Sequence, residues 1–285
     1  MTTPRAPGDA AALLVSEPVP KLLRDLIHER TGLYFEPERF DTMLEKLQPR
    51  ASALGCTSYL DYYYILKYDE NGPEEWHRVL DAFSVQETYF WREFDQIRWL
   101  VDYVVPQWFS RHTEPLRIWS AACATGEEPY SIAMALQNGG WGHHPIEIIA
   151  SDASEAALAK ARAGIYRERS FRSLPPELRA KYFSPSPQGD VLNQEVRNKV
   201  EFRWANLMSP SDYPDLRDLQ AVFCRNVFIY FSAAAITRVV AAMAVGLQPR
   251  SHLFVGASES LLKLTSDFEL QEHQGVFVYV RKAGS

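Results

Sequence analysis

The sequence predicts an α/β fold: a doubly wound, mostly parallel sheet, preceded by a small all-helical domain. Three observations indicate this fold. Residues 21 to about 105 carry apolar side chains at helical spacing and few strand signals, whereas short β-rich runs alternate with helical stretches from Leu116 onward. Such alternation is typical of a parallel sheet with helices on both faces. The 285 residues also exceed the roughly 250 at which single cores tend to divide.

Two apolar stripes predict the first two helices of the helical domain, and Thr31-Gly32 separates them. Their members are Leu22, Leu23, Leu26 and Ile27 in the first stripe, and Phe40, Met43, Leu44 and Leu47 in the second. Further helices are expected over 58–68, 74–83 and 94–108. We expect a flexible N-terminus over residues 1–18, the helical domain over 19–92 and the sheet domain over 93–285.

Seven strands are expected in the sheet domain, the last two as an antiparallel pair around Gln274-Gly275. The expected strands cover 116–120, 146–151, 200–204, 221–227, 252–256, 268–270 and 276–280. The expected helices between them cover 129–136, 154–163 and 233–245. Polar, Pro-rich residues 167–199 break the alternation and are too many for an ordinary loop. They therefore predict an inserted subdomain.

Composition and charge exclude several classes of protein. The net charge of −6 argues against a nucleic-acid binder that relies on a bulk positive field. Cys56, Cys123 and Cys224 lie far apart, and the histidines lack HExxH spacing, so we expect a reducing compartment, no disulfides and no metal. The apolar run at residues 10–15 is too short for a secretory signal or a membrane span. We expect a cytoplasmic monomer without membrane insertion.

A run of small residues, from Ala121 to Gly126, separates the first expected strand from the next helix. Open α/β sheets bind ligands beyond the carboxyl ends of their strands, and small residues let a ligand approach the backbone. Dinucleotide enzymes carry GxGxxG here, but this chain has one glycine followed by Glu127 and Glu128. Two carboxylates would repel a pyrophosphate and suit a cationic ligand such as S-adenosylmethionine. Alternatively, they only complement the positive end of the helix dipole.

The second expected strand runs into Asp152. An acidic residue at this point of such folds hydrogen-bonds the hydroxyls of a ribose. Alternatively, Asp152 caps the helix that begins near Ser154. Both roles are compatible at adjacent positions.

Four segments together resemble a known family, the CheR chemotaxis receptor methyltransferases. They are FSVQETYFWRE (83–93), GEEPYSIAMAL (126–136), ASDASEAALAKARAGIY (150–166) and FCRNVFIYF (223–231), and the resemblance extends from about residue 22 to 280. It implies a class I S-adenosylmethionine-dependent methyltransferase with a helical N-terminal domain and a small β subdomain, here at 167–199. It also implies that the protein is a protein-glutamate O-methyltransferase. Such enzymes form glutamate methyl esters on the cytoplasmic domains of methyl-accepting chemotaxis receptors during adaptation and release S-adenosylhomocysteine.

The resemblance also implies roles for individual residues. Thr88 and Arg92 match cofactor-contacting positions, Glu127 or Glu128 binds the amino-acid portion, and Asp152 binds the ribose. The remaining cofactor positions are Ala121 in the small-residue loop, Asn206 and Leu207 around the adenine, and Arg225 and Asn226 at the transfer pocket. Arg92, Arg225 and Tyr230 are the candidate catalytic residues. The chain departs from the family pattern at Gln86, where the family has Asn and a cofactor contact is expected, and at Trp91, where it has Phe.

The expected chemistry needs no general base, because a glutamate carboxylate is already ionised at neutral pH. An in-line displacement would depend on positioning and desolvation. Arg92 and Arg225 are expected to orient carboxylates, with structural ion pairs as the alternative. A methyltransferase acting on another carboxylate or a small molecule, and a non-catalytic binding module, are the competing hypotheses.

Receptor helices near methylation sites are rich in glutamate, so a positive face on the helical domain would help docking. The candidates are Lys21, Arg24, His28, Arg39, Lys46 and Arg50. Acidic residues are interspersed among them, so a solvated mixed-charge surface is the alternative. The sequence leaves open whether a receptor C-terminal pentapeptide binds the β subdomain.

Overall fold

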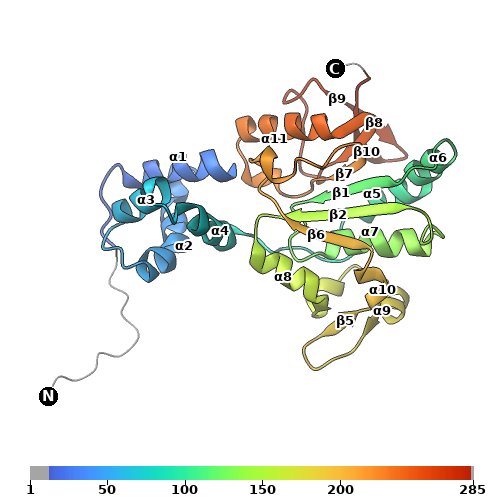
Figure 1. Cartoon of the computed structure of the whole chain (residues 1–285), viewed down its shortest axis with the longest axis horizontal. Helices are drawn as coiled ribbons and strands as arrows, with labels where there is room; N and C mark the ends of the chain where they lie inside the picture. The colour runs from blue at the N-terminus through green and yellow to red at the C-terminus, as the bar shows by residue number, and fades with distance from the viewer. Residues whose placement is uncertain (1–12, 284–285) are drawn as a thin grey trace. The chain divides into compact units, whose positions relative to one another are not determined.

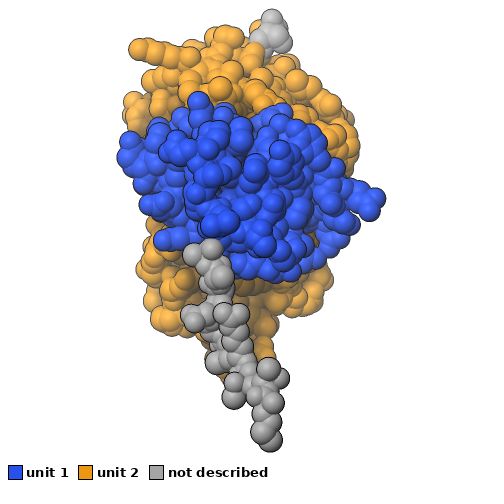
Figure 2. Space-filling view, turned by 90° about the vertical axis from the view of Figure 1, so that its left-hand side faces the viewer, with its two compact units in different colours: residues 1–83 blue, residues 84–285 orange. Residues whose placement is uncertain are grey.

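The structure is a computed structural model that describes residues 13–283 (Figure 1). The chain divides into two compact units after Phe83, coloured separately in Figure 2. This division lies nine residues before the expected boundary at residue 92. The reason is Phe90, which is fully buried in the second unit against Tyr166 and Phe183, and whose N–H donates to the carbonyl of Ser170.

The first unit contains four α-helices, and its core confirms both apolar stripes. Leu23 and Ile27 of the first stripe and Met43 and Leu47 of the second have no exposed surface, whereas Leu22 is only partly buried. The helices are α1 (Val19–Thr31), α2 (Phe40–Ala53), α3 (Tyr59–Tyr68) and α4 (Gly72–Phe83), with the short 3₁₀ turn η1 (Pro37–Arg39) before α2.

Two residues of the expected flexible N-terminus, Leu13 and Leu14, contact the helical unit. Residues 1–12 lie outside the described residues. Leu13 is buried, and Leu14 pairs with the segment before α3: its N–H donates to Thr57 and its carbonyl accepts from Tyr59, both at 3.2 Å. This pairing holds the residues before α1 against the unit.

The second unit is built on the expected seven-stranded sheet. Its order is β6-β2-β1-β7-β8-β10-β9, and β10 is antiparallel to both neighbours while the pairs among the first five strands are parallel. The strands are β1 (Leu116–Ala121), β2 (Ile146–Asp152), β6 (Val200–Trp204), β7 (Leu219–Phe223), β8 (Leu247–Phe254), β9 (Phe268–His273) and β10 (Val276–Arg281).

Helices cover both faces of this sheet, as the alternating pattern predicts. Ile118 of β1 contributes to one core with α7 and α8, whereas its neighbour Trp119 faces the opposite core with α11. In Figure 1, α11 lies on one side of the sheet and α7 and α8 on the other. These helices are α7 (Glu127–Asn138), α8 (Glu155–Ala163) and α11 (Ala233–Gly246).

Two expected elements differ from the structure. The helix expected over 94–108 is three joined segments, α5 (Phe94–Trp99), the π-helical η2 (Leu100–Val104) and α6 (Val105–Phe109). The strand expected over 221–227 ends at Phe223. The side chain of Arg225 points into a buried polar network, and Asn226 has a left-handed backbone, with φ of 61°. The residues after Phe223 therefore belong to a loop at the carboxyl edge of the sheet.

The inserted subdomain is a second, three-stranded sheet in the order β3-β5-β4. It begins at Ile165, two residues before the expected start. Its elements are β3 (Ile165–Tyr166), η3 (Glu168–Phe171), α9 (Pro176–Tyr182), β4 (Phe183–Ser184), β5 (Asp190–Leu192) and α10 (Gln194–Arg197). Two further 3₁₀ turns, η4 (Pro210–Asp212) and η5 (Phe228–Tyr230), follow β6 and β7. No helix between residues 13 and 283 has the length and apolar character needed to cross a membrane.

Candidate active site

The loop between β1 and α7 has an unusual backbone. Ala122, Ala124 and Gly126 all have positive φ, of 57°, 47° and 91°. A Cβ on Gly126 would lie 2.8 Å from Cβ of Ala161 in α8, so glycine is required here for helix packing as well as for the turn. Ala121 itself is buried, and it can offer a ligand only its main chain.

Asp152 holds this loop to the end of β2. One carboxylate oxygen accepts the N–H of Ala124 and the other accepts the N–H of Ser154, both at 2.8 Å. The N-cap of α8 is Ser154, whose hydroxyl accepts from Ala157 at 3.0 Å, so the capping alternative belongs to Ser154. A carboxylate has about four acceptor sites, so these two bonds do not by themselves exclude a ligand.

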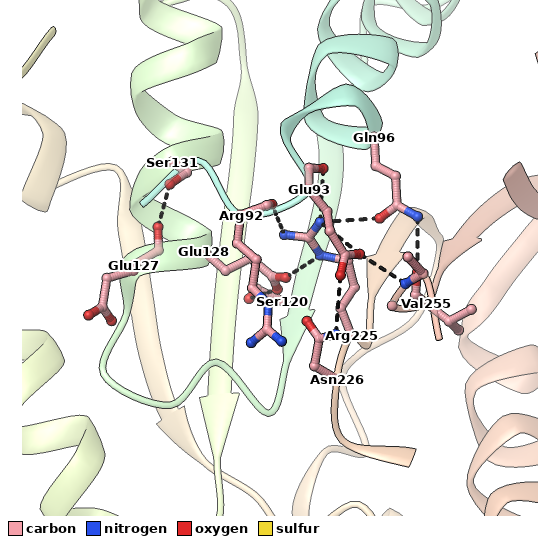
Figure 3. A network of polar contacts seen from close by, with 12 residues as sticks. Arg92, Glu93, Gln96, Ser120, Glu127, Glu128, Ser131, Arg225, Asn226 and Val255 are labelled. Atoms are coloured by element: carbon pink, nitrogen blue, oxygen red, sulfur yellow. Dashed lines mark hydrogen bonds and ion pairs between the residues drawn. The ribbon is translucent and has the colours of Figure 1, made fainter. Parts of the chain in front are cut away.

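Glu127 and Glu128 point in different directions, although they are adjacent in the first turn of α7 (Figure 3). Glu127 is only 2% exposed, and its carboxylate accepts from the hydroxyls of Thr125 at 2.6 Å and Ser170 at 2.9 Å. Burial raises its pKa. No cationic side chain forms an ion pair with Glu127 among residues 13–283, so its buried charge is stabilised by neutral hydroxyls.

Glu128 faces the opposite way, toward Arg225 (Figure 3). Its carboxylate accepts from the hydroxyl of Ser120 at 2.6 Å and from Nε of Arg225 at 2.7 Å. The pair joins the first turn of α7 to the loop after β7. Of the two carboxylates that suggested a cationic ligand, this one is therefore already neutralised by the protein.

Arg225 is the centre of a buried network, and its side chain is 2% exposed. Besides Glu128, it donates to the carbonyls of Arg92 at 3.0 Å and Glu93 at 3.1 Å, and to the side chain of Gln96 at 3.2 Å. We expected this guanidinium to orient a substrate carboxylate. In the structure its N–H groups are bonded to the protein, as a buried arginine requires.

Arg92, Thr88 and Gln86 come from the segment before α5. The guanidinium of Arg92 donates to the carbonyl of Glu87 at 2.9 Å and lies 5.6 Å from the ring centre of Tyr89. The hydroxyl of Thr88 has no partner among the described residues. The side-chain carbonyl of Gln86 accepts a hydrogen bond from Lys160 of α8 at 2.6 Å. The side chain that is longer here than the family's Asn therefore contacts the protein.

The segment is held by strained backbone and by packing. Trp91 and Glu93 have left-handed φ, of 66° and 48°, and Trp91 stacks on Phe94. The main-chain N–H of Trp91 donates to the hydroxyl of Ser131 at 3.1 Å. Because Arg225 binds the next two carbonyls, this strained turn is fixed from two sides.

Asn206 and Leu207 follow β6 at the same edge of the sheet. Asn206 is half-buried; its side-chain carbonyl accepts from the N–H of Met208 at 3.0 Å, and its own N–H donates to Asp212 at 3.1 Å. Leu207 is buried in the core that contains α11. Tyr230 lies in η5 and is 37% exposed, and its hydroxyl has no partner among the described residues.

Sequence reasoning missed Glu93 and Glu259. Glu93 accepts from the side-chain amide of Asn226 at 3.2 Å and from the N–H of Ala257 at 3.1 Å. Glu259 lies in the loop after β8. It accepts hydrogen bonds from main-chain amides of that loop and of the loop after β7. Glu93 is the last residue of the first family segment, so its position in that motif could have identified it. Glu259 carries no such sequence signal, because its partners are backbone groups.

These features define the class of protein. The sheet order with only β10 reversed, and an acidic residue at the end of β2, are those of class I S-adenosylmethionine-dependent methyltransferases. The chain belongs to the CheR methyltransferase family: residues 86–277 match the model of its SAM-binding domain, and residues 21–84 match that of its all-alpha domain.

Several bacterial proteins are similar to this chain along most of their length. Chemotaxis protein methyltransferase 2 of Vibrio cholerae is 35% identical over 257 residues, 87% of each chain. The chemotaxis protein methyltransferase of Escherichia coli K12 is 32% identical over 259 residues, 87% of this chain and 86% of that protein. Chemotaxis protein methyltransferase 1 of Pseudomonas aeruginosa is 35% identical over 270 residues, 92% and 97% of the two chains.

The cofactor of this methyltransferase is S-adenosylmethionine, and the residues at this edge of the sheet fit it. Asp152 is a carboxylate at the end of β2, and a carboxylate is an acceptor that suits ribose hydroxyls. Glu127 is a buried carboxylate without an ion pair among residues 13–283, which suits the ammonium group of the cofactor. Of the two glutamates in the charge argument from the sequence, Glu127 is the one without an ion pair among residues 13–283.

Proposed function

We propose that this protein forms glutamate methyl esters on the cytoplasmic domains of chemotaxis receptors, and so serves chemotactic adaptation in the cytoplasm. The observation that carries the proposal is that each carboxylate of the site has protein partners. Glu128 pairs with Arg225, Glu127 lies between two hydroxyls, and Asp152 binds main-chain amides. An acceptor that must lose a proton would need a free base, whereas a glutamate carboxylate needs none.

The names of the relatives support the chemotactic part of the proposal. Three of them, from V. cholerae, E. coli and P. aeruginosa, are chemotaxis protein methyltransferases, and each aligns with 86% or more of its own length. Both the helical and the SAM-binding domains of this chain match models of the family. A receptor is the protein substrate that such a role requires.

For cofactor binding, we assign Asp152 to the ribose hydroxyls, Asn206 and Leu207 to the adenine, and Glu127 to the ammonium group. Glu127 is preferred to Glu128 because its charge has no cationic partner among the described residues, whereas Glu128 is already paired. The main chain of Ala121, the side chain of Thr88 and the loop at Arg225-Asn226 complete the set. Gln86 is the weakest member, since it binds Lys160.

S-adenosylmethionine, when bound, supplies a methyl group on a sulfonium. The residues of the chain then have to align a carboxylate with it and exclude water. Within residues 13–283, Arg92 makes one hydrogen bond through its guanidinium, so its other N–H groups can orient the acceptor. Tyr230 contributes the hydroxyl of an exposed side chain. Arg225 acts on the reaction through the segment that carries Arg92, whose carbonyl it binds at 3.0 Å.

The positive face proposed for receptor docking is smaller than the sequence suggests. Arg50 binds buried Glu75 through two hydrogen bonds, of 3.0 and 2.7 Å, and Arg24 pairs with Asp25 at 2.6 Å. Lys46 is half-buried and lies over the ring of Phe83. Lys21 and Arg39 are exposed, so they are the better candidates for contacting an acidic receptor helix.

The proposal is tested by incubating the protein with S-adenosylmethionine labelled in the methyl group and receptor cytoplasmic fragments. Glutamate esters release the label as methanol in mild base, whereas methylated amines do not. We expect base-labile label on the receptor fragment. Base-stable label, or no label from a protein that binds S-adenosylhomocysteine, would show that the acceptor is a different one.

A further inference from the structure

One carboxylate outside the family segments gathers main-chain amides from two loops. Oε2 of Glu259 accepts from the N–H groups of Asn226 at 2.8 Å and Gly256 at 2.6 Å. Oε1 accepts from Phe228 at 2.7 Å and Ile229 at 3.3 Å. Hydrogen bonds to an ionised acceptor are about twice as strong as neutral ones. Glu259 therefore joins the loop after β7 to the loop after β8.

The amides bound by Oε1 open the short turn η5, which carries Tyr230. The first N–H groups of a helical turn have no hydrogen-bond acceptor within the turn, and here the carboxylate of Glu259, distant in sequence, is that acceptor. Glu93 adds a second bridge, because its two oxygens bind the side chain of Asn226 and the N–H of Ala257. Asn226, with its left-handed backbone, is thus held through both its main chain and its side chain.

Gly256 permits this close approach of the two loops. A Cβ at position 256 would lie 2.4 Å from Nδ2 of Asn226, 3.0 Å from its main-chain N and 2.9 Å from Oε2 of Glu259. Real Cβ atoms do not approach other atoms this closely, so any larger residue would displace Asn226 and Glu259 from their present positions. Two residues of the loop after β8 therefore fix the geometry of Asn226. Glu259 does so through its hydrogen bond, and Gly256 does so because it has no side chain.

We propose that Glu259 is a positioning residue: it holds Asn226 and the turn carrying Tyr230 in the conformation that binds the cofactor and admits the acceptor. The inference rests on the proposed role of the Arg225–Tyr230 loop in the site. Glu259 acts through main-chain amides and is not assigned a contact with either substrate.

The test compares Glu259→Gln with Ser258→Ala. Glutamine has nearly the same shape, but its NH₂ group would face amide donors. Ser258 is an exposed neighbour in the same loop without a side-chain hydrogen bond among residues 13–283. We expect Glu259→Gln to weaken S-adenosylhomocysteine binding by about tenfold or more, by calorimetry well below the unfolding temperature. Ser258→Ala should bind as the parent does.

A second variant reaches the same loop from a different residue. Gly256→Ala keeps the carboxylate but inserts a methyl group against Asn226. Gly142→Ala is its control, because a Cβ there would meet Gln137 at ordinary contact distances of 3.4 Å and more. Hydrogen exchange should show lost protection at the amides of Asn226 and Phe228 in Glu259→Gln and Gly256→Ala, and unchanged protection in both controls.

The outcomes distinguish a positioning role of Glu259 in the site from a role in protein stability alone. If Glu259→Gln lowers the unfolding temperature but the folded protein binds S-adenosylhomocysteine as tightly as the parent, the inference is wrong. Unchanged amide protection would overturn it as well. Calorimetry needs no methyl acceptor, so a protein that binds the product but methylates no receptor fragment would contradict the proposed function and leave this test intact.

Discussion

Nε of Arg225 donates to Oε2 of Glu128 at 2.7 Å, and this ion pair joins the loop after β7 to the first turn of α7. Both side chains were expected to face a ligand. The structure shows them facing one another, with the carbonyls of Arg92 and Glu93 bound to the same guanidinium. The pair thus ties the turn at Arg92 and Glu93 to α7 and to the loop after β7.

Removing one partner of this pair should cost much more than removing both. Arg225→Met leaves the part-buried carboxylate of Glu128 without its cation, and breaking a fully buried pair in this way typically costs about 3–5 kcal/mol of unfolding free energy, an upper value here. Adding Glu128→Gln should recover a large part of that loss. Urea unfolding of the two single variants and the double variant measures the coupling. Simple additivity of the two losses would show that the pair does not act as a unit.

Asp152→Ala should weaken S-adenosylhomocysteine binding at least about tenfold, or about 1.4 kcal/mol, because the ribose hydroxyls lose a charged acceptor. Ser154→Ala is the matched control: it removes the N-cap of α8, at a cost of about 1 kcal/mol in stability, and leaves the carboxylate in place. Calorimetry on both variants separates the two effects. Equal affinity of Asp152→Ala and the parent would remove Asp152 from the ribose site.

Glu127 should make the stability of the protein fall as the pH rises. Burial raises its folded-state pKa above the ordinary value of 4.5, so the folded protein holds this proton more tightly than the unfolded chain does. Below pH 4.5 Glu127 therefore makes its full contribution to the free energy of unfolding. This contribution is lost as the pH rises from 4.5 through the folded-state pKa of Glu127. Glu127→Gln removes the dependence.

Urea unfolding at several pH values checks this sign. Relative to the parent, Glu127→Gln should become more stable as the pH rises above 4.5, and it should bind S-adenosylhomocysteine more weakly. Glu177→Gln, at an exposed position in α9, should track the parent throughout. A parent and a Glu127→Gln variant with parallel pH profiles would contradict the direction that we give for this pKa.

Lys21 and Arg39 should contribute to receptor docking. The double change Lys21→Glu and Arg39→Glu should raise KM for an acidic receptor fragment several-fold at low salt, with less effect at high salt. Arg111→Glu with Arg238→Glu alters net charge equally at exposed positions of the sheet unit and serves as the control. If both double variants raise KM alike, net charge and not a docking face determines the effect.

Local pattern was sufficient for most of the sheet. The strand expected over 200–204 has the bounds of β6, and the expected start of β1 is also correct. Apolar, β-branched runs between turn signals carry this information within a few residues. The π-helical stretch Leu100–Val104 has no comparable signature, because its apolar spacing also fits the continuous helix that was expected.

The site was predictable in its location and less so in its contacts. Cys224, Arg225 and Asn226 read as the end of a strand, yet their conformation depends on partners up to 133 residues away in the chain. Glu127 and Glu128 are neighbours of the same type, and only the position of Arg225 decides which one is neutralised. Glu259 binds backbone amides, which every residue but proline offers, so no motif identifies it.

The central claim, that the acceptor is a glutamate carboxylate, is tested most directly by mass spectrometry. A receptor cytoplasmic fragment is incubated with the protein and S-adenosylmethionine, and the added methyl group is located by fragmentation of its peptides. The account predicts methyl groups on glutamate side chains that disappear after mild base, and fewer of them with Asp152→Ala when S-adenosylmethionine is limiting. Methyl groups on any other residue type, or none from a protein that binds S-adenosylhomocysteine, would contradict it.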